Sequence, residues 1–309
     1  MAFFLGIDGG GTKTRCVLGD EVNVLASSMA GGSNPVRLGV DKAREALHSA
    51  IRQACTAAGI ELHEIQAACV GASGGARPEL AAKIREILVE LNPKLSPDRI
   101  EVVGDTVIAL DAAFGTGPGV IVIAGTGSIA YGRNGTGETA RAGGWGFAIS
   151  DEGSGQWIGR NAVAAILRGR DLGQETALSA AVLEEWKLAN LEALVQFANS
   201  TPPPEFPRLF RIVLHAAEEG DAIARDLLMR AGTELAAIAA IVIRRIAAAP
   251  PYVPVAMTGS VFRQSVEVRE VFYNQLNCSF PGLELRSDIV DPVMGALSRA
   301  RFLGASART

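Results

Sequence analysis

The chain has 309 residues, of which 48% are hydrophobic and 20% are charged. This is the composition of an ordinary globular protein, and it excludes intrinsic disorder, which combines low hydrophobicity with high net charge. The length predicts about two domains with sizeable cores, and the net charge of −4 gives the whole chain no attraction to nucleic acid or to an anionic membrane.

The first part of the chain alternates apolar runs with glycine-rich turns and amphipathic segments. Short apolar runs predict strands over 3–8, 15–18, 22–29, 65–72 and 100–103. Apolar residues at helical spacing predict helices over 41–58 and 78–91, the first capped by Asp41, and a further helix that begins at Asp105. The predicted order is βββαβαβα, which indicates an α/β fold.

The second part repeats this opening more loosely. A second βββ unit is predicted from 120 to about 142, followed by helices over 152–168, 176–199, 205–217 and 221–248. A strand over 253–257, a helix to about 275 and a terminal helix over 292–302 complete the pattern. A turn-rich stretch at 115–119 divides the two parts, so we expect domains at 1–116 and 117–309, with the last helix able to pack back on the N-terminal domain.

The spacing of the cysteines and histidines and the length of the apolar runs argue against several classes of protein. The 4 cysteines and 3 histidines are widely spaced, which argues against a disulfide scaffold and against a zinc site. The chain starts without the basic segment of a signal peptide, and its longest apolar run, at 235–243, is shorter than the roughly 20 residues of a membrane span. We therefore expect a cytoplasmic protein.

Two glycine-rich turns that follow predicted strands are candidate phosphate-binding loops. Such turns expose backbone N–H groups to an anion, and here Thr12, Thr126 and Ser128 add hydroxyl groups beside the glycines. Neither turn has the spacing of a P-loop, and neither fits the dinucleotide-binding fingerprint because a strand follows instead of a helix. Two such hairpins that face each other would hold a nucleoside triphosphate between two domains. Two ordinary tight hairpins are the alternative.

Five motifs in order resemble the BadF/BadG/BcrA/BcrD-type ATPase family and, within it, the N-acetylglucosamine kinases. They are Asp-Gly-Gly-Gly-Thr-Lys-Thr at 8–14, Gly-Asp at 104–105, Ala-Gly-Thr-Gly-Ser at 124–128, Gly-Gly-Trp-Gly at 143–146 with Ser-Asp-Glu-Gly-Ser at 150–154, and Thr-Gly-Ser at 258–260. The resemblance spans nearly the whole chain. It implies the actin-like, sugar-kinase fold: two ribonuclease-H-like domains, a helical insertion in the second, and a cleft between them that closes over ATP and Mg²⁺.

The same resemblance assigns roles to individual residues. Asp8 would hold Mg²⁺ through water. The residues that would contact ATP are Gly10, Gly11, Thr12, Lys13, Gly125, Thr126, Gly127, Gly259 and Ser260. The residues that would contact the sugar are Asn34, Ser73, Gly74, Asp105, Gly144, Trp145 and Asp151. The alternatives are a solvated hairpin charge for Lys13, a packing role for Trp145 and a helix cap for Asp151.

Asp105 matches the catalytic base of the family. It follows a predicted strand and opens a helix, so its carboxylate would point from the end of the sheet towards a substrate hydroxyl. Phosphoryl transfer needs such a carboxylate to orient the hydroxyl and take its proton. The alternative is that Asp105 is simply the N-cap of the helix, where aspartate is common.

The resemblance implies a kinase that phosphorylates the 6-hydroxyl of an amino sugar, most closely N-acetylglucosamine. The products would be the sugar 6-phosphate and ADP, and the protein would bind a small sugar, no nucleic acid and no membrane, as a homodimer. Two departures leave glucosamine or another hexosamine open. Ala76-Arg77 follows Gly75, where the family's amino-sugar kinases usually have an acidic residue, and no bulky aromatic residue follows Asn34.

Two other classes of function remain as alternatives. Some members of the family are ATPase activators of radical dehydratases or reductases, which bridge an iron–sulfur cluster through cysteines at a dimer interface. Cys69 is the one cysteine near a plausible interface. The third possibility is a sugar-binding sensor that uses the same fold without turnover, although an intact Asp105 and two phosphate turns argue against a dead enzyme.

Overall fold

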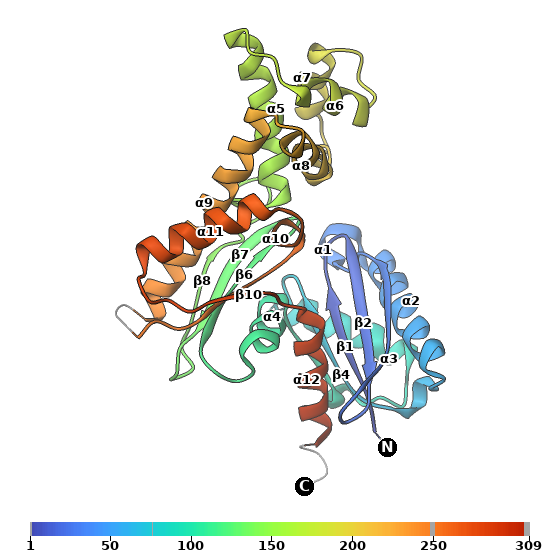
Figure 1. The fold of residues 1–309 in the computed structure, drawn as a ribbon. Coiled ribbons are helices and arrows are strands. Elements are labelled where there is room, and N and C mark those ends of the chain that lie inside the picture. The colour runs from blue at the N-terminus through green and yellow to red at the C-terminus, as the bar shows by residue number, and fades with distance from the viewer. Residues whose placement is uncertain (1, 76, 248–250, 306–309) are drawn as a thin grey trace. The chain divides into compact units, whose positions relative to one another are not determined.

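The structure is a computed structural model that describes residues 2–75, 77–247 and 251–305. The chain forms two compact units, each built around its own sheet (Figure 1). Unit 1 consists of Met1–Gly117 together with Val290–Thr309, and unit 2 is Pro118–Ile289. The predicted end of one helix at 248 and the residue at 76 lie outside the described residues.

Unit 1 contains a five-stranded sheet in the order β3-β2-β1-β4-β5. The first three strands are antiparallel, and β4 and β5 run parallel to β1. Its elements are β1 (Phe3–Gly9), β2 (Lys13–Gly19), β3 (Val24–Gly31), α1 (Pro35–Leu38), α2 (Val40–Ala58), β4 (Ile65–Ala72), α3 (Pro78–Leu91), β5 (Ile100–Gly104), α4 (Asp105–Phe114) and α12 (Pro292–Ala305), with short 3₁₀ turns at Leu62–Glu64 and Pro97–Arg99. The predicted α/β fold is confirmed, and the four-residue α1 is an addition that is too short to show helical periodicity.

The predicted cap of α2 is wrong. Gly39 occupies the N-cap position, while Asp41 lies in the first turn and pairs with Arg44 at 2.7 Å. An acidic residue in the first turn still stabilises the helix through the positive end of its dipole. The opposite end closes as expected for a helix, with Gly59 in the left-handed conformation.

Helices cover both faces of the unit 1 sheet. The alternation of β1 sends Phe3, Leu5 and Ile7 into the core formed with α2 and α3, and Phe4 into a second core formed with α12. Figure 1 shows α12, the red C-terminal helix, beside β1. The approach is so close that a Cβ atom on Gly6 would lie 2.4 Å from the backbone nitrogen of Leu297.

An ion-pair network also fixes α12 to unit 1. The guanidinium of Arg299 donates to Asp111 on α4 at 2.6 Å and to Glu101 on β5. The hydrogen bonds to Glu101, and then those to Asp111, raise the pKa of Arg299 above its usual value. Because α4 starts at Asp105, the network holds the helix that carries this candidate base.

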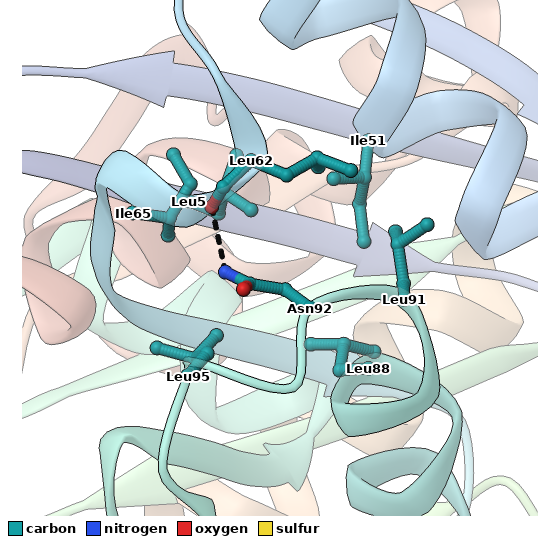
Figure 2. A pocket seen from close by; sticks show the side chains of 8 residues that line it. All are labelled: Leu5, Ile51, Leu62, Ile65, Leu88, Leu91, Asn92 and Leu95. Carbon is teal, nitrogen blue, oxygen red and sulfur yellow. Dashed lines mark hydrogen bonds between the residues drawn. The ribbon is translucent and has the colours of Figure 1, made fainter.

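The core of unit 1 is closed at the amino ends of its parallel strands (Figure 2). Leucine and isoleucine side chains around Leu5 and Ile65 leave a cavity of only about 10 Å³, which has no room for a ligand. The one polar group there is satisfied, because the side-chain amide of Asn92 donates to the carbonyl oxygen of Leu62 at 2.6 Å. This core cavity therefore offers no ligand site.

Unit 2 contains a five-stranded sheet in the order β10-β9-β6-β7-β8. A group of helices, α5 to α9, is inserted in the chain between β8 and β9. The elements are β6 (Gly119–Ala124), β7 (Ser128–Arg133), β8 (Thr139–Gly143), α5 (Gly155–Leu172), α6 (Ala177–Glu185), α7 (Leu191–Ala198), a 3₁₀ turn (Phe206–Leu209), α8 (Phe210–Glu218), α9 (Ala222–Ile246), β9 (Val255–Thr258), α10 (Ser260–Gln264), α11 (Val266–Ser279) and β10 (Leu285–Ile289). Figure 1 shows α9 crossing the sheet and α5–α8 gathered at one end of it. No helix of the described residues is long and apolar enough to cross a membrane.

The predicted elements of unit 2 differ from the structure in three places. The helix expected after Gly259 to about 275 is two helices, α10 and α11, and Ser265 caps the second. The single helix expected over 176–199 is also broken, because α6 ends at Glu185 and Asn190 caps a new helix, α7. Trp186 fills this break by packing edge-on against Phe197 and Phe206, with ring centroids 5.0 and 5.8 Å away. The strand β10 was not predicted, since it lies at the sheet edge and its middle residues are exposed and polar.

The contact between β1 and α12 can be tested with a small substitution. Gly6→Ala should lower the free energy of unfolding by at least about 2 kcal/mol, because the new methyl group meets backbone atoms that cannot rotate away. Gly135→Ala is the control: nothing lies within 4 Å of a Cβ there, and the change should stay within about 0.5 kcal/mol. Urea unfolding measures both. Equal stability of the two variants would contradict this packing.

Candidate functional site

Polar residues of unit 1 gather at the carboxyl ends of β1, β4 and β5. In the parallel ladders Asp8 pairs with Gly71, and Ala72 pairs with Gly104, the residue before Asp105. The small residue at position 71 is required, since a Cβ atom there would lie 2.1 Å from the side chain of Ile108. Asp8, the turn after β4 and Asp105 are therefore brought to one edge of the sheet.

The pKa of Asp8 reflects the negative charge at this edge of the sheet. Its pKa is raised to about 6, first by burial and next by the negative charge of Asp105. Asp291, at the start of α12, raises it further, while Lys13 and Arg15 lower it. Arg15 and Asp291 form an ion pair of 2.6 Å. The edge thus holds more buried negative charge than the nearby cations balance, which favours a positively charged ligand.

The first glycine-rich turn is a closed hairpin at the same edge. The N–H of Gly10 donates to the carbonyl of Lys13 at 3.0 Å, and the N–H of Ser33 donates to the carbonyl of Gly10 at 3.0 Å. Thr12 and Lys13 are exposed at the tip. The guanidinium of Arg37 comes within 3.2 Å of the place a Cβ of Gly11 would take. The tip thus carries an exposed hydroxyl group and an exposed cation, Lys13, while the Gly10 N–H is used inside the turn.

Asn34 lies next to this turn and also caps a helix. Its side-chain oxygen accepts from the N–H groups of Val36 and Arg37 at 3.0 and 3.2 Å. This hydrogen bonding orients the side chain and commits its oxygen to α1. A sugar hydroxyl would therefore meet Asn34 mainly as an N–H donor.

The turn after β4 lies between the first glycine-rich turn and Asp105. The N–H of Ser73 approaches the carbonyl of Gly9 at 3.5 Å, and Gly74 has a positive φ of 79°. Gly75 packs so closely over β5 that a Cβ atom would lie 2.3 Å from the carbonyl oxygen of Val103. Ser73 and Gly74, both predicted sugar contacts, are thus placed beside the end of β5.

Asp105 is the first residue of α4, and the N-cap position belongs to Gly104. Its carboxylate accepts from the N–H of Thr106 at 2.9 Å. Burial raises the pKa of Asp105, and the backbone N–H of Thr106 opposes that shift. The side chain is thus not the N-cap, and a carboxyl with a raised pKa is a better proton acceptor.

Unit 2 has a second glycine-rich turn closed in the same way. The N–H of Gly125 donates to the carbonyl of Gly127 at 2.9 Å. The carbonyls of Gly125 and Thr126 accept from the first N–H groups of α5, those of Gly155 and Gln156, at 2.8 and 3.1 Å. The start of α5 therefore fixes the turn.

The predicted adenosine motif adjoins this second turn. Gly259 has a φ of 108°, and a Cβ atom there would lie 2.1 Å from the carbonyl oxygen of Ala124. The hydroxyl of Ser260 is 3.9 Å from the place a Cβ of Gly125 would take. The fold thus brings together two motifs that are far apart in sequence, as one ligand with a phosphate and a nucleoside would need.

Asp151 lies against the same turn. Its carboxylate accepts from the N–H of Ser128 at 3.2 Å and would be 2.8 Å from a Cβ on Gly127. Its φ is 71°, and burial raises its pKa. The alternative that Asp151 caps α5 is wrong, because Ser154 occupies the N-cap and accepts from the N–H of Trp157. A strained, buried carboxylate that is no cap is a functional candidate.

Trp145 is an exposed ring on the loop after β8. It is 67% exposed, which excludes the alternative of a core tryptophan and leaves that of a turn-packing one open. The guanidinium of Arg141 lies 4.3 Å from the ring centroid and donates to the carbonyls of Gly143 and Gly144. A Cβ on Gly144 would lie 2.9 Å from Ile129, which fixes the loop to β7. The ring is held in place and open to a ligand.

Several residues near the candidate site of unit 1 were not predicted from the sequence. Arg15, Ser33 and Arg37 sit in or beside predicted motifs, but nothing in their local pattern separates them from surface residues. Arg37 lies three residues after Asn34, so the two could have been placed together only if the short helix α1 had been predicted. Asp291 joins the site solely because α12 returns to unit 1.

Asp8 suits Mg²⁺ better than a metal that needs several protein ligands. No group of three or more histidine, cysteine, aspartate or glutamate side chains able to hold a metal ion is present among the described residues. Mg²⁺ commonly binds one or two carboxylates and takes its other ligands from water and phosphate. The uncompensated negative charge around Asp8 fits such an ion.

Comparison with known proteins identifies the family. Residues 5–300 match the model of the BadF/BadG/BcrA/BcrD ATPase family. The chain belongs to this family. A curated relative from Clostridium acetobutylicum, named N-acetylmuramic acid/N-acetylglucosamine kinase, is 32% identical over 97% of this chain and 99% of its own length. An N-acetyl-D-glucosamine kinase of Dictyostelium discoideum is 28% identical over 95% of this chain and 96% of its own.

A solved structure agrees with these relatives. It is a Chromobacterium violaceum protein provisionally named as an N-acetylglucosamine kinase, with a TM-score of 0.75 and 28% identity. The match covers 98% of this chain and 99% of that one. The predicted family and the predicted fold of the sugar kinases are both confirmed.

Asp151 provides a test of the local geometry in unit 2. Asp151→Asn should keep the stability of the protein or raise it, because asparagine tolerates the positive φ, still accepts from Ser128 and carries no charge to bury. Asp151→Ala should lower the free energy of unfolding by about 1–3 kcal/mol, from backbone strain and the unsatisfied N–H. Thermal unfolding measures both, and equal losses in the two variants would argue against the structure.

Proposed function

We propose that this protein transfers the γ-phosphoryl group of ATP to the 6-hydroxyl of N-acetylglucosamine. The chain is a kinase of amino sugars that uses ATP, as its family and its full-length relatives show. The observation that carries the finer proposal is Asp105: a half-buried carboxylate whose pKa is raised by desolvation, at the end of β5, beside the turn that holds Ser73.

Asp105 would act as the general base. Its carboxylate takes the proton of the 6-hydroxyl as that oxygen attacks the γ-phosphorus. The new O–P bond forms while the bond between phosphorus and the bridging oxygen of ADP breaks. The raised pKa makes the carboxylate a stronger proton acceptor, and the Thr106 N–H keeps it oriented.

We expect phosphate contacts from the two glycine-rich turns. In unit 1 these are the exposed hydroxyl of Thr12 and the charge of Lys13, with Gly11 leaving space at the tip. In unit 2 they come from the turn at Gly125, whose neighbours Gly259 and Ser260 leave room for the nucleoside. Mg²⁺ bound through Asp8 would neutralise charge on the phosphates.

Polar and apolar side chains would bind the sugar. Asn34 offers N–H groups to a hydroxyl, and Asp151 offers carboxylate oxygens. The exposed ring of Trp145 gives an apolar plane for a sugar face or an acetyl methyl group. A homodimer and a cytoplasmic location stay predictions.

The activator alternative gains no support from the cysteines. Cys69, the cysteine expected near an interface, is fully buried, and burial raises its pKa well above the usual value. A thiol in that environment is a poor cluster ligand. Among the described cysteines Cys278 is exposed, whereas Cys16, Cys55 and Cys69 are buried.

Asp105→Asn tests the base. We expect a folded protein that still binds the sugar, with turnover reduced at least about 100-fold, because the amide cannot accept the proton. Asp41→Asn is the matched control: it removes the same charge from the first turn of another helix in unit 1, where the carboxylate is 95% exposed. ADP release measures turnover, and calorimetry measures sugar binding. Near wild-type turnover in Asp105→Asn would remove the assignment.

The position of transfer is tested with sugars. ADP release should be stimulated most by N-acetylglucosamine in a panel with glucosamine, N-acetylmannosamine, N-acetylgalactosamine and glucose. The 6-deoxy form of N-acetylglucosamine should bind and inhibit without forming a phosphorylated product, since it lacks the attacking hydroxyl. A phosphorylated product from the 6-deoxy sugar, detected by mass spectrometry, would show transfer to another hydroxyl.

A further inference from the structure

Ser33 is a buried residue at the first glycine-rich turn that the proposed function does not use. It is only 2% exposed, and its backbone N–H donates to the carbonyl of Gly10 at 3.0 Å. Its side-chain hydroxyl has no hydrogen-bond partner among the described residues. The hydroxyl of Ser28 on the preceding strand is different, because it donates to the carbonyl of Ala50 at 2.6 Å.

The unpartnered hydroxyl of Ser33 reaches the surface at this edge of the sheet. In the part of the chain that the structure describes, no fully buried side-chain oxygen or nitrogen lacks a partner. The Ser33 hydroxyl lacks one, so it is the part of this buried residue that keeps contact with solvent. A hydroxyl with little access to water and no protein partner is unfavourable, and such a group calls for an explanation.

The neighbouring glycine leaves space for this oxygen. A Cβ atom on Gly9 would lie 2.7 Å from the hydroxyl oxygen of Ser33. Gly9 directly follows Asp8, and its carbonyl accepts from the N–H of Ser73 at 3.5 Å. If Ser33 only filled space, alanine would pack there without an unpaired oxygen. The hydroxyl thus has a defined place beside Asn34 and the turn that carries Ser73.

The polar groups of unit 1 complement each other as sugar ligands. The side-chain oxygen of Asn34 is used by α1, so Asn34 offers N–H donors. The carboxylate of Asp105 offers acceptors. The hydroxyl of Ser33 can donate to one oxygen atom and accept from another, which is also the capacity of a sugar hydroxyl.

The order of the strands indicates which part of the sugar would reach Ser33. The order at this edge is β1-β4-β5, with Gly9 on β1 and Asp105 directly after β5. Neighbouring strands lie about 4.8 Å apart, so two spacings separate β1 from β5. A 6-hydroxyl held by Asp105 lies towards β5. The hydroxyl of Ser33, over Gly9, then faces the ring of the same sugar.

We propose that Ser33 is a specificity-determining residue whose hydroxyl binds a ring hydroxyl of the sugar. In N-acetylglucosamine the ring hydroxyls are those at C1, C3 and C4, whereas the 6-hydroxyl is on the exocyclic carbon. The bound sugar gives Ser33 the hydrogen-bond partner that the protein alone does not supply. The inference rests on the proposed function, because the 6-hydroxyl must reach Asp105 for the ring to lie beside Ser33.

The experiment combines two serine variants with four sugars. Ser33→Ala removes the unpartnered hydroxyl. Ser28→Ala is the matched control, since it removes a hydroxyl that is bonded inside unit 1. The sugars are N-acetylglucosamine and its 1-deoxy, 3-deoxy and 4-deoxy forms. Calorimetry gives the Kd of each sugar and of ATP, ADP release gives kcat and KM, and thermal unfolding gives Tm for the wild type and both variants.

Ser33→Ala should raise the Kd and KM for N-acetylglucosamine about 5- to 10-fold and change kcat less than about 2-fold, because it removes a hydrogen bond made before and during the reaction. For one of the three deoxy sugars, the one without the partner hydroxyl, Ser33→Ala and the wild type should have equal Kd values. The Tm of Ser33→Ala should be unchanged or higher, since no bond within the protein is lost. Ser28→Ala should lower the Tm and leave every Kd unchanged.

Other results would overturn the inference. An equal loss of affinity for all four sugars would mean that Ser33 acts through packing, and a lower Tm with unchanged Kd values would make its hydroxyl structural. Weaker binding of ATP with unchanged sugar binding would assign the hydroxyl to the nucleotide. In these three cases the wild type would still phosphorylate N-acetylglucosamine, whereas a wild type that phosphorylates no sugar would remove the proposed function itself.

Discussion

The parallel register of β1, β4 and β5 is the constraint on which the candidate site of unit 1 depends. It aligns Asp8 with Gly71 and places Gly104 beside Ala72, so the chain leaves each strand at the same edge. The carboxylate of Asp105 is then near enough to raise the pKa of Asp8. A shift of one residue in either ladder would turn these side chains to the other face of the sheet and separate the charges.

Glycines allow the backbone to pack closely at this edge of the unit 1 sheet and at the glycine-rich turn of unit 2. Gly71 admits Ile108, Gly75 rests on the carbonyl of Val103, and Gly259 rests on the carbonyl of Ala124. In both units a glycine N–H closes the glycine-rich turn on a carbonyl within the same turn. These hydrogen bonds hold each turn in its conformation without a ligand. Rigidity here comes from missing side chains and from backbone hydrogen bonds, with few ion pairs.

Most of the strands and helices, and the motifs of the candidate site, could be predicted from the sequence. Buried strands such as β1 and β6 are continuous apolar runs that end at glycine, so their pattern reveals them. β10 is exposed and polar, and the break before α7 depends on how Trp186 packs, so neither has a local pattern. The ion pair of Arg15 and Asp291 joins residues from opposite ends of the chain, and only the packing of α12 on β1 brings them together.

The balance of charge at the edge of unit 1 links the fold to the proposed chemistry. Burial raises the pKa of Asp8 to about 6, and the negative charges of Asp105 and Asp291 add to that shift. Arg15 and Arg299 do not remove this excess of negative charge, because Arg15 is paired with Asp291 and Arg299 with Glu101 and Asp111. A cation bound at this edge would favour the charged form of Asp8. The strand register that brings Asp8 and Asp105 together therefore also sets the charge that a metal ion would neutralise.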